Sequence, residues 1–416
     1  MNIENTIVYF HIGRFTGGDI MECILVSKGK TYSTIKFNDY GGIKKVNCTP
    51  LSVQRSNLTA THVGNYALFG GGADSSYKST VDAYYTSLTR STPTALSVAR
   101  SGLSATHVGN YALFGGGYSG SSSSYPNTVD AYDTSLTRST PTALSVARSI
   151  LAATHVGNYA LFGGGGDYDS YYSKVDAYDT SLTRTTPAAL SVESQFLAAT
   201  HVGNYALFGG GSSYSYKSTV DAYDTSLTRS TPTALSVARY QLSATHIVDY
   251  ALFGGGYGSS PYYKDTVDAY DTSLTRSTPT ALSVARQSLV ATHVGDYALF
   301  GGGEGSSSSY SNTVDAYDTS LTRSTPTELS VARRYLSATH IGNYALFGGG
   351  YDGSSQTYKD TVDAYNVISS LNLSMYPGNK YKLNNMTEEV EVTEFNNITV
   401  SAPVNGYIKI KNSTLS

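Results

Sequence analysis

The sequence predicts an all-β fold, a seven-bladed β-propeller of four-stranded antiparallel blades, on the basis of three observations. The stretch Tyr-Ala-Leu-Phe-Gly-Gly-Gly occurs seven times, each time within a repeat of 45 to 48 residues. Such a period is typical of solenoids and propellers, because one unit cannot bury its apolar face alone. Each repeat also divides into four short strands separated by turn residues. No segment has apolar residues at helical spacing, which excludes a helical solenoid.

The second copy illustrates the four strands of one blade. Residues 103–108 form a first strand that ends at a Gly-Asn pair, a favoured hairpin turn. Residues 111–114 form the second strand, which three glycines stop, and residues 128–132 form the third. A fourth strand is expected near residues 137–140, just before a proline. An outer edge strand suits proline because it can spare an amide donor.

The two ends of the repeat array are expected to close the ring. The seventh copy departs from the pattern before its fourth strand, while residues 47–55 resemble the end of a blade, residues 139–148. We therefore expect an N-terminal strand to complete the last blade, which also covers an open sheet edge. The predicted organisation is an N-terminal β-hairpin module at 1–44, the propeller at 45–366 and a small C-terminal β module at 367–416.

Composition excludes several classes of function. The net charge is −3 and no basic stripe is present, which argues against nucleic-acid binding. Cys23 and Cys48 form neither a disulfide framework nor a metal-ligand pattern. No apolar run is long enough to cross a bilayer, so no membrane insertion is expected. The start lacks a signal-peptide pattern, and we expect a cytoplasmic, virion-associated or tail-associated protein. The oligomeric state is not indicated.

The histidine that recurs in every repeat could suggest a metal site, but a structural role explains it better. One histidine per repeat would make a metal ring only if the imidazoles converged within about 2 Å of one ion. We expect them instead to be spread around a wide ring, each bonded to a backbone carbonyl or to an acid such as Asp130. The histidines are His62, His107, His155, His201, His246, His293 and His340.

One aspartate per repeat could suggest a glycosidase, but that chemistry places two carboxylates at one site. Pairing with the repeated arginines is expected instead, because half-buried charges need partners. The glycine runs lack the lysine and helix of a phosphate-binding loop, and we expect them to allow close strand approach and positive φ. The aspartates are Asp82, Asp130, Asp176, Asp221, Asp268, Asp315 and Asp363.

Three marks carry a family resemblance. Gly115–Gly117 after an apolar strand, then Tyr132, then Arg148, with counterparts in the other copies, resemble the kelch repeat over about three quarters of the chain. The tryptophan expected six residues after the tyrosine is replaced by Arg138, and the chain has no tryptophan. The near-identical copies are also similar to bacterial and prophage surface or tail-associated propellers. A galactose-oxidase-like copper site would need a cysteine inside the propeller, and both cysteines precede the blades.

The copies differ at two places that should share one face of the propeller. One is the loop between the second and third strands, and the other is the residue pair that follows each blade-ending Val-Ala-Arg. These segments are rich in Tyr, Ser and Gly, a composition typical of adaptable binding surfaces. Drift of solvent-exposed loops after duplication is the alternative explanation of the variation.

We therefore predict a non-enzymatic recognition propeller that binds a glycan or a protein, without cofactor or metal. The alternative is a scaffold or assembly protein whose terminal modules make the contacts, and a third hypothesis is a copper or glycoside-acting enzyme. The predicted ligand-binding residues are aromatic, with one arginine as a hydrogen-bond donor: Tyr118, Tyr125, Tyr171, Tyr172, Tyr240, Tyr257, Tyr262, Tyr263, Tyr310, Arg334, Tyr335, Tyr351 and Tyr358.

Overall fold

The chain folds into two units in this computed structural model. Residues 42–120, 124–306 and 309–367 are described in full, and strands toward both ends are described by their backbone. One unit is Lys45–Asn366, and the other combines Met1–Lys44 with Val367–Ser416. The unit Lys45–Asn366 begins and ends with the array of sequence repeats.

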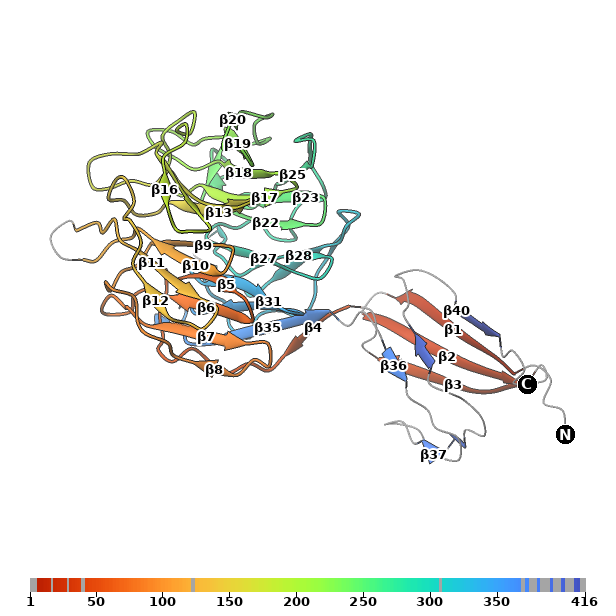
Figure 1. Ribbon diagram of the computed structural model, residues 1–416. Coiled ribbons are helices and arrows are strands. Elements are labelled where there is room, and N and C mark those ends of the chain that lie inside the picture. Colours follow the sequence, from red (N-terminus) through yellow and green to blue (C-terminus); the bar gives the residue numbers. More distant parts are fainter. Residues whose placement is uncertain are drawn as a thin grey trace. The chain divides into compact units, whose positions relative to one another are not determined.

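The described part of Lys45–Asn366, with the strand that enters it, forms seven four-stranded antiparallel sheets around an axis (Figure 1). The predicted seven-bladed propeller is therefore confirmed. The innermost strands are β5 (Thr59–Val63), β9 (Ser104–Val108), β13 (Ala152–Val156), β17 (Ala198–Val202), β22 (Ser243–Ile247), β27 (Val290–Val294) and β31 (Ser337–Ile341). The second strands are β6 (Tyr66–Gly70), β10 (Tyr111–Gly115), β14 (Tyr159–Gly163), β18 (Tyr205–Gly209), β23 (Tyr250–Gly254), β28 (Tyr297–Gly301) and β32 (Tyr344–Gly348).

The outer half of each blade holds a longer third strand and a short edge strand. The third strands are β7 (Val81–Tyr85), β11 (Val129–Asp133), β15 (Val175–Asp179), β19 (Val220–Asp224), β25 (Val267–Asp271), β29 (Val314–Tyr317) and β35 (Val362–Val367). The outer strands are β8 (Arg90–Ser91), β12 (Arg138–Ser139), β16 (Arg184–Thr185), β20 (Arg229–Ser230), β26 (Arg276–Ser277), β30 (Arg323–Ser324) and β4 (Ile43–Val46).

The N-terminal strand closes the propeller. The seventh blade has the order β31-β32-β35-β4, so its outer strand comes from the start of the repeat array, as expected. This strand, Ile43–Val46, lies just before the segment that carries the sequence resemblance. Lys45 Nζ lies 2.8 Å from Asp363 Oδ1, where the other blades use an arginine of their own edge strand. A lysine from the other end of the array thus completes the last blade.

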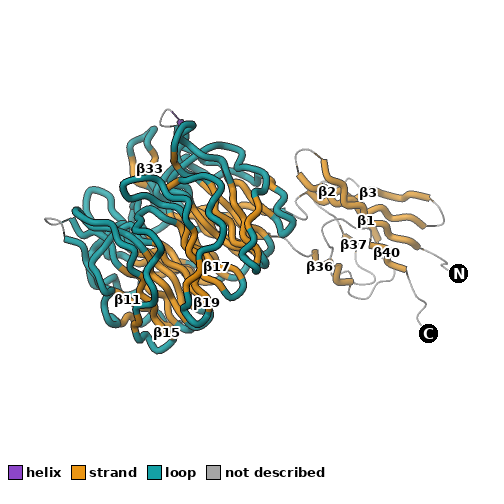
Figure 2. Tube along the Cα trace, turned by 90° about the horizontal axis from the view of Figure 1, so that it is seen from above, coloured by secondary structure: helices purple, strands orange, loops and turns teal. Residues whose placement is uncertain are grey.

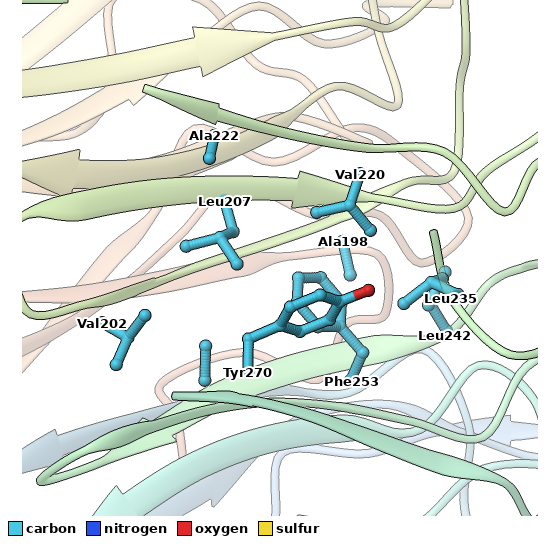
Figure 3. Packing of buried hydrophobic residues seen from close by; sticks show 10 residues of the cluster. Ala198, Val202, Leu207, Val220, Ala222, Leu235, Leu242, Phe253 and Tyr270 are labelled. Carbon is cyan, nitrogen blue, oxygen red and sulfur yellow. The ribbon is translucent and has the colours of Figure 1, made fainter. Parts of the chain in front are cut away.

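The apolar cores lie between neighbouring blades. In one of them Leu207 and Val220 of the fourth blade pack against Phe253 and Tyr270 of the fifth, all nearly free of solvent contact (Figure 3). The two aromatic rings meet edge to face at 5.9 Å. Burying one such side chain contributes about 2–3 kcal/mol. Because each blade buries its apolar face only against the next, the repeats are stable as a ring.

Buried arginine–aspartate pairs tie each blade to the connection before it. Asp130 is fully buried and accepts from Arg100 Nη2 at 2.7 Å, from Arg138 Nη1 at 3.2 Å and from the Ser97 amide at 3.0 Å. The predicted pairing of repeated acids with repeated arginines is therefore confirmed. The fourth blade is an exception, because Ser194 stands in place of the fully buried arginine and Asp221 retains Arg229.

The glycine runs fit the predicted role. A Cβ on Gly115 would lie 2.9 Å from the Phe162 ring of the next blade. One on Gly116, which has φ +69°, would lie 2.6 Å from the carbonyl oxygen of Arg148. Only glycine permits this approach and this backbone conformation without displacement.

The other unit joins the two terminal segments in one sheet, where the sequence suggested separate modules. Its strands follow the order β3 (Lys30–Asn38), β2 (Gly18–Ser27), β1 (Thr6–Phe15), β40 (Ile408–Lys411). In it, Phe10 pairs with Ile408. Two further pairs are β36 (Leu371–Leu373) with β39 (Ile398–Val400), and β37 (Lys380–Tyr381) with β38 (Val390–Glu391).

Candidate functional site

The variable segments of all seven blades gather on one face of the propeller. In every blade the connection that follows the previous blade pairs with the loop after the second strand, for example Ser101 with Tyr118 and Arg334 with Tyr351. Short strands do the same in the fifth blade, where β21 (Arg239–Tyr240) pairs with β24 (Tyr257–Gly258). We call this surface the variable face. Figure 2 shows β33 (Tyr351–Asp352), which pairs with β34 (Thr357–Tyr358), among its loops.

The nearly invariant turns lie together on the opposite face, the turn face. A Cβ on Gly64, in the first hairpin turn, would lie 3.1 Å from Thr134 in the later turn of the next blade. The same relation joins Gly109 to Thr180. Uniform contacts between neighbouring blades account for the uniform sequence of these turns. The copies therefore differ on one face and agree on the other.

A ring of backbone hydrogen bonds surrounds the axis on the variable face. In each connection one amide donates to the carbonyl oxygen of the equivalent residue one blade earlier, at 2.8 to 3.4 Å. The ring closes where the Asn57 amide donates to the Tyr335 carbonyl. We call these seven residues the axial ring: Asn57, Gly102, Ile150, Phe196, Gln241, Ser288 and Tyr335.

The axial ring holds side chains in a strained backbone conformation. All seven residues have φ between +52° and +61°, the left-handed region that favours Gly and Asn. Asn57 and Gly102 suit it, whereas Ile150, Phe196 and Tyr335 do not. Strain of this kind persists where the surrounding structure enforces it and is common at functional sites. The chain thus tolerates bulky side chains at a place where smaller residues would fit the backbone better.

An open pocket of about 260 Å³ lies inside the axial ring. The ring side chains line it, together with one leucine from the start of each blade. These leucines are themselves buried or nearly buried, and they give the pocket much of its apolar surface. They are Leu58, Leu103, Leu151, Leu197, Leu242, Leu289 and Leu336.

Most predicted tyrosines contact other aromatic rings on this face, and they fall into two main clusters. The first we call the fifth-blade cluster: Phe196, Tyr216, Tyr240, Tyr257, Tyr262 and Tyr263. Tyr216 stacks on Tyr240 with an interplanar angle of 5°, and Tyr257 stacks on Tyr262 at 10°. Burial, then the neighbouring Tyr216 and Tyr257, raises the pKa of Tyr240.

The second cluster centres on Arg334, between the sixth and seventh blades. Its guanidinium lies 4.6 Å from the ring centre of Tyr335 and 5.3 Å from that of Tyr310. It also forms an ion pair with Glu304. The ion pair and the two rings already engage Arg334, whose role as a hydrogen-bond donor to a ligand stays a prediction. Tyr351 extends the cluster by contacts with Tyr310 and Tyr358.

The remaining predicted tyrosines lie in other loops of the variable face. Tyr118 contacts Tyr125 and Tyr77, and Tyr171 contacts Tyr214. Tyr172 donates a 2.6 Å hydrogen bond to Asp167. Sequence reasoning missed Phe196, Tyr77, Tyr168, Tyr214 and Tyr216. The last four lie in the variable loops, and Tyr214 and Tyr168 are the most exposed large hydrophobic side chains among the described residues, at 85% and 79%.

The seven repeated histidines converge instead of spreading, so that expectation was wrong. Neighbouring imidazole centres are 3.8 to 4.2 Å apart around a closed ring, from His62 to His107 and finally from His340 back to His62. Asp130 is occupied by arginines, so it is no partner for these rings. Period-2 alternation on the innermost strands explains the arrangement, since Leu58, Ala60 and His62 share one side.

The environment of this histidine ring opposes protonation. Burial lowers the pKa of His107, His201 and His293 to about 4 and that of His62 to about 3. Burial, together with the charge of neighbouring imidazoles, lowers the pKa of His155, His246 and His340 further still. All seven rings are therefore neutral at pH 7.

Metal-ligand geometry and membrane-spanning helices can be assessed for the described residues. In those residues no group of three or more His, Cys, Asp or Glu side chains is arranged to hold a metal ion. No helix among them is long and apolar enough to cross a membrane.

Comparison with known proteins supports the fold. No family model and no curated protein matches the chain. A solved structure described as the structure of YjhT is similar, with a TM-score of 0.54 and 12% sequence identity. The match covers 67% of this chain and 99% of that one. At this level of identity the similarity shows the propeller fold alone.

Proposed function

We propose that this protein is a non-enzymatic recognition propeller that binds a glycan or protein partner through its variable face. The observation that carries the proposal is that sequence variation, clustered tyrosines and bulky residues with a left-handed backbone all lie on one face. Drift alone would place small, backbone-compatible residues at the left-handed positions of the axial ring as readily as Ile150 or Phe196. Tyrosine supplies rigid contact area with a polar end, which suits sugar rings and protein surfaces alike.

The exposed edge of the fifth-blade cluster is expected to contact the partner. Tyr262 is 56% exposed, and one face of its ring stacks on Tyr257. Tyr216, 38% exposed, is supported in the same way by Tyr240. Stacked pairs hold the outer ring in one orientation, so less side-chain entropy is lost on binding. A preorganised aromatic platform of this kind is what a recognition surface requires.

A binding screen with matched variants tests the proposal. The intact chain is applied to a glycan array and to a displayed peptide library, and any ligand found is measured against Tyr216→Ala, Tyr262→Ala and Tyr85→Ala. Tyr85 is 39% exposed and borders the turn face, so it is the control. A loss of at least tenfold in the first two variants, with none in Tyr85→Ala, supports recognition by the variable face. Equal affinity in all three variants contradicts it.

We infer further that the blades are of the kelch type. The three marks of that repeat have distinct roles here: Gly116 permits contact with the next blade, the Tyr132 hydroxyl donates to the Thr94 carbonyl at 2.7 Å, and Arg148 binds Asp176 at 2.8 Å. The position of the missing tryptophan is held by Arg138, which pairs with Asp130. An ion pair therefore stands where an aromatic ring would pack.

The scaffold hypothesis is the second candidate, because the terminal segments form a unit of their own through β1 and β40. Removing residues 368–416 separates the two roles. Lost assembly with retained ligand binding would favour the scaffold role for the terminal unit. A substrate screen for oxidase and glycosidase activity, with and without added copper, tests the enzyme hypothesis.

A further inference from the structure

The axial pocket differs in chemistry from the tyrosine clusters around it. Its floor is made of the seven leucines, and Ile150, Phe196 and Tyr335 contribute to its wall. Gln241 and Ser288 stand on the other part of the wall. The pocket therefore combines the apolar side chains of the leucines with polar groups such as the buried Ser288 hydroxyl, and it lies in a surface rich in tyrosine.

The backbone of the axial ring has little hydrogen bonding to offer a ligand. Each of its seven amides donates to a neighbouring carbonyl oxygen, and each of those carbonyls accepts that bond. The ring amides are therefore not available to a sugar hydroxyl that enters the recess, and the leucine side chains carry no donor. The Ser288 hydroxyl, which is buried without a hydrogen-bond partner among the described residues, is a polar atom that lines the recess. A hydroxyl placed on the floor would lose its water without gaining a partner, which is unfavourable. The pocket thus favours a largely apolar group with few polar atoms over a sugar ring, which carries several hydroxyl groups.

The size of the pocket limits that group to one side chain. An apolar cavity of about 150 Å³ binds benzene, so the volume of about 260 Å³ found here admits a larger ring such as indole. The surrounding tyrosine clusters extend beyond this volume over the fourth to seventh blades, and a single small molecule would leave them uncovered. An occupant that also covers the clusters is a side chain carried by a larger partner.

We propose that the axial pocket anchors one aromatic side chain of a protein partner. This inference rests on the proposed recognition function and specifies a subsite within it. Interface anchors are commonly aromatic side chains that fill a desolvated pocket near the centre of the contact, surrounded by weaker contacts. The side chains of Phe196, Tyr335 and Ile150, whose backbone is left-handed, then form the walls that contact the partner's aromatic side chain. The tyrosine clusters make the surrounding contact.

The test uses N-acetyltryptophanamide and the full chain. The protein has no tryptophan, so indole emission reports on the probe alone. Binding is expected to shift the emission to shorter wavelength and to raise its anisotropy. Ser288→Phe is the plugging variant, because Phe196 and Tyr335 show that the same backbone conformation accepts an aromatic residue. Ser288→Phe should weaken probe binding at least tenfold and leave the thermal midpoint unchanged. Tyr85→Ala should bind the probe as tightly as the natural chain.

A peptide selection completes the design and separates the two proposals. Peptides selected from the displayed library should share one aromatic position, and Ser288→Phe should abolish their binding. Methyl α-glucoside should not displace the probe. Absence of probe binding at millimolar concentration, equal binding by the plugged variant, or displacement by the glucoside overturns the pocket proposal. If peptides bind, lose affinity in Tyr262→Ala and ignore the plug, recognition stands and the pocket proposal fails. If the probe binds while no variable-face substitution affects any partner, the proposed function fails alone.

Discussion

The backbone amide of Asn57 donates a 2.9 Å hydrogen bond to the carbonyl oxygen of Tyr335. This bond joins the connection before the first blade to the connection before the last. This bond closes the propeller near its axis, and the Lys45–Asp363 ion pair closes it at the outer edge of the seventh blade. A closed ring holds the seven variable connections in fixed register, so that side chains from distant parts of the sequence can form one surface.

Acidification should destabilise the propeller through the histidine ring. Free histidine has a pKa near 6.5, and the folded protein lowers it to about 4 at His107, His201 and His293. The unfolded chain therefore binds more protons below pH 6.5, and stability falls as the pH decreases from 6.5 toward 4. Thermal unfolding from pH 8 to pH 4.5 measures this, and His201→Gln should reduce the slope. A midpoint that does not change over this range would contradict the account.

Removing one buried arginine should be severely destabilising. Arg148→Ser leaves the buried Asp176 with only Arg184, 3.6 Å away, and two contacts from Ser145. Breaking a buried pair by removing one partner costs about 3–5 kcal/mol. Urea unfolding of the variant measures the loss. A change below about 1 kcal/mol would show that solvent replaces the guanidinium easily.

The fourth blade offers the reverse substitution. Ser194 occupies the position of the arginine, so neither Asp221 nor the Phe208 carbonyl has the donor that the other blades supply. Ser194→Arg combined with Glu193→Ala restores the repeat pattern and should raise the thermal midpoint. A lower midpoint would mean that the fourth blade has repacked around the serine.

Closure of the ring should depend on Lys45. Its ammonium group is partly exposed, and Asp363 keeps Arg333 as a second partner at 2.9 Å. Lys45→Met should therefore cost about 1 kcal/mol, less than loss of a fully buried arginine. Protease susceptibility at the junction of the first and seventh blades should increase in parallel. Equal losses for Lys45→Met and Arg148→Ser would contradict this ranking.

Relief of backbone strain should stabilise the protein. Ile150 has φ +55°, a conformation that costs a β-branched residue about 1–2 kcal/mol and that asparagine adopts readily. Ile150→Asn should raise stability by about 1 kcal/mol despite the loss of a partly exposed apolar contact. Differential scanning calorimetry of the variant measures this. Ala153→Asn, on the strand that follows, is the control and should give no gain.

The architecture could be predicted from the sequence because the same pattern of strands and turns recurs in seven copies. Strand positions, closure by an N-terminal segment and the pairing of repeated acids with repeated arginines follow from copies that agree. The closing strand itself, Ile43–Val46, lies just before the segment predicted for it. The shared face follows from the antiparallel order of the strands. The histidine ring was missed because histidines placed one per blade were expected to be spread around a wide ring. The alternation of Leu58, Ala60 and His62 was visible as a signal. The strain at Ile150 and Phe196 could not be read from residue types, since it depends on φ at the axis.

A recognition role for the axial ring is tested most directly by replacing its variable side chains with asparagine, the residue that the first connection already uses. A variant with Ile150→Asn, Phe196→Asn, Gln241→Asn, Ser288→Asn and Tyr335→Asn is compared with the natural chain for thermal midpoint and for affinity to a selected ligand. We expect an unchanged or higher midpoint with at least a tenfold loss of affinity. Retained affinity at an unchanged midpoint would contradict a recognition role for these residues.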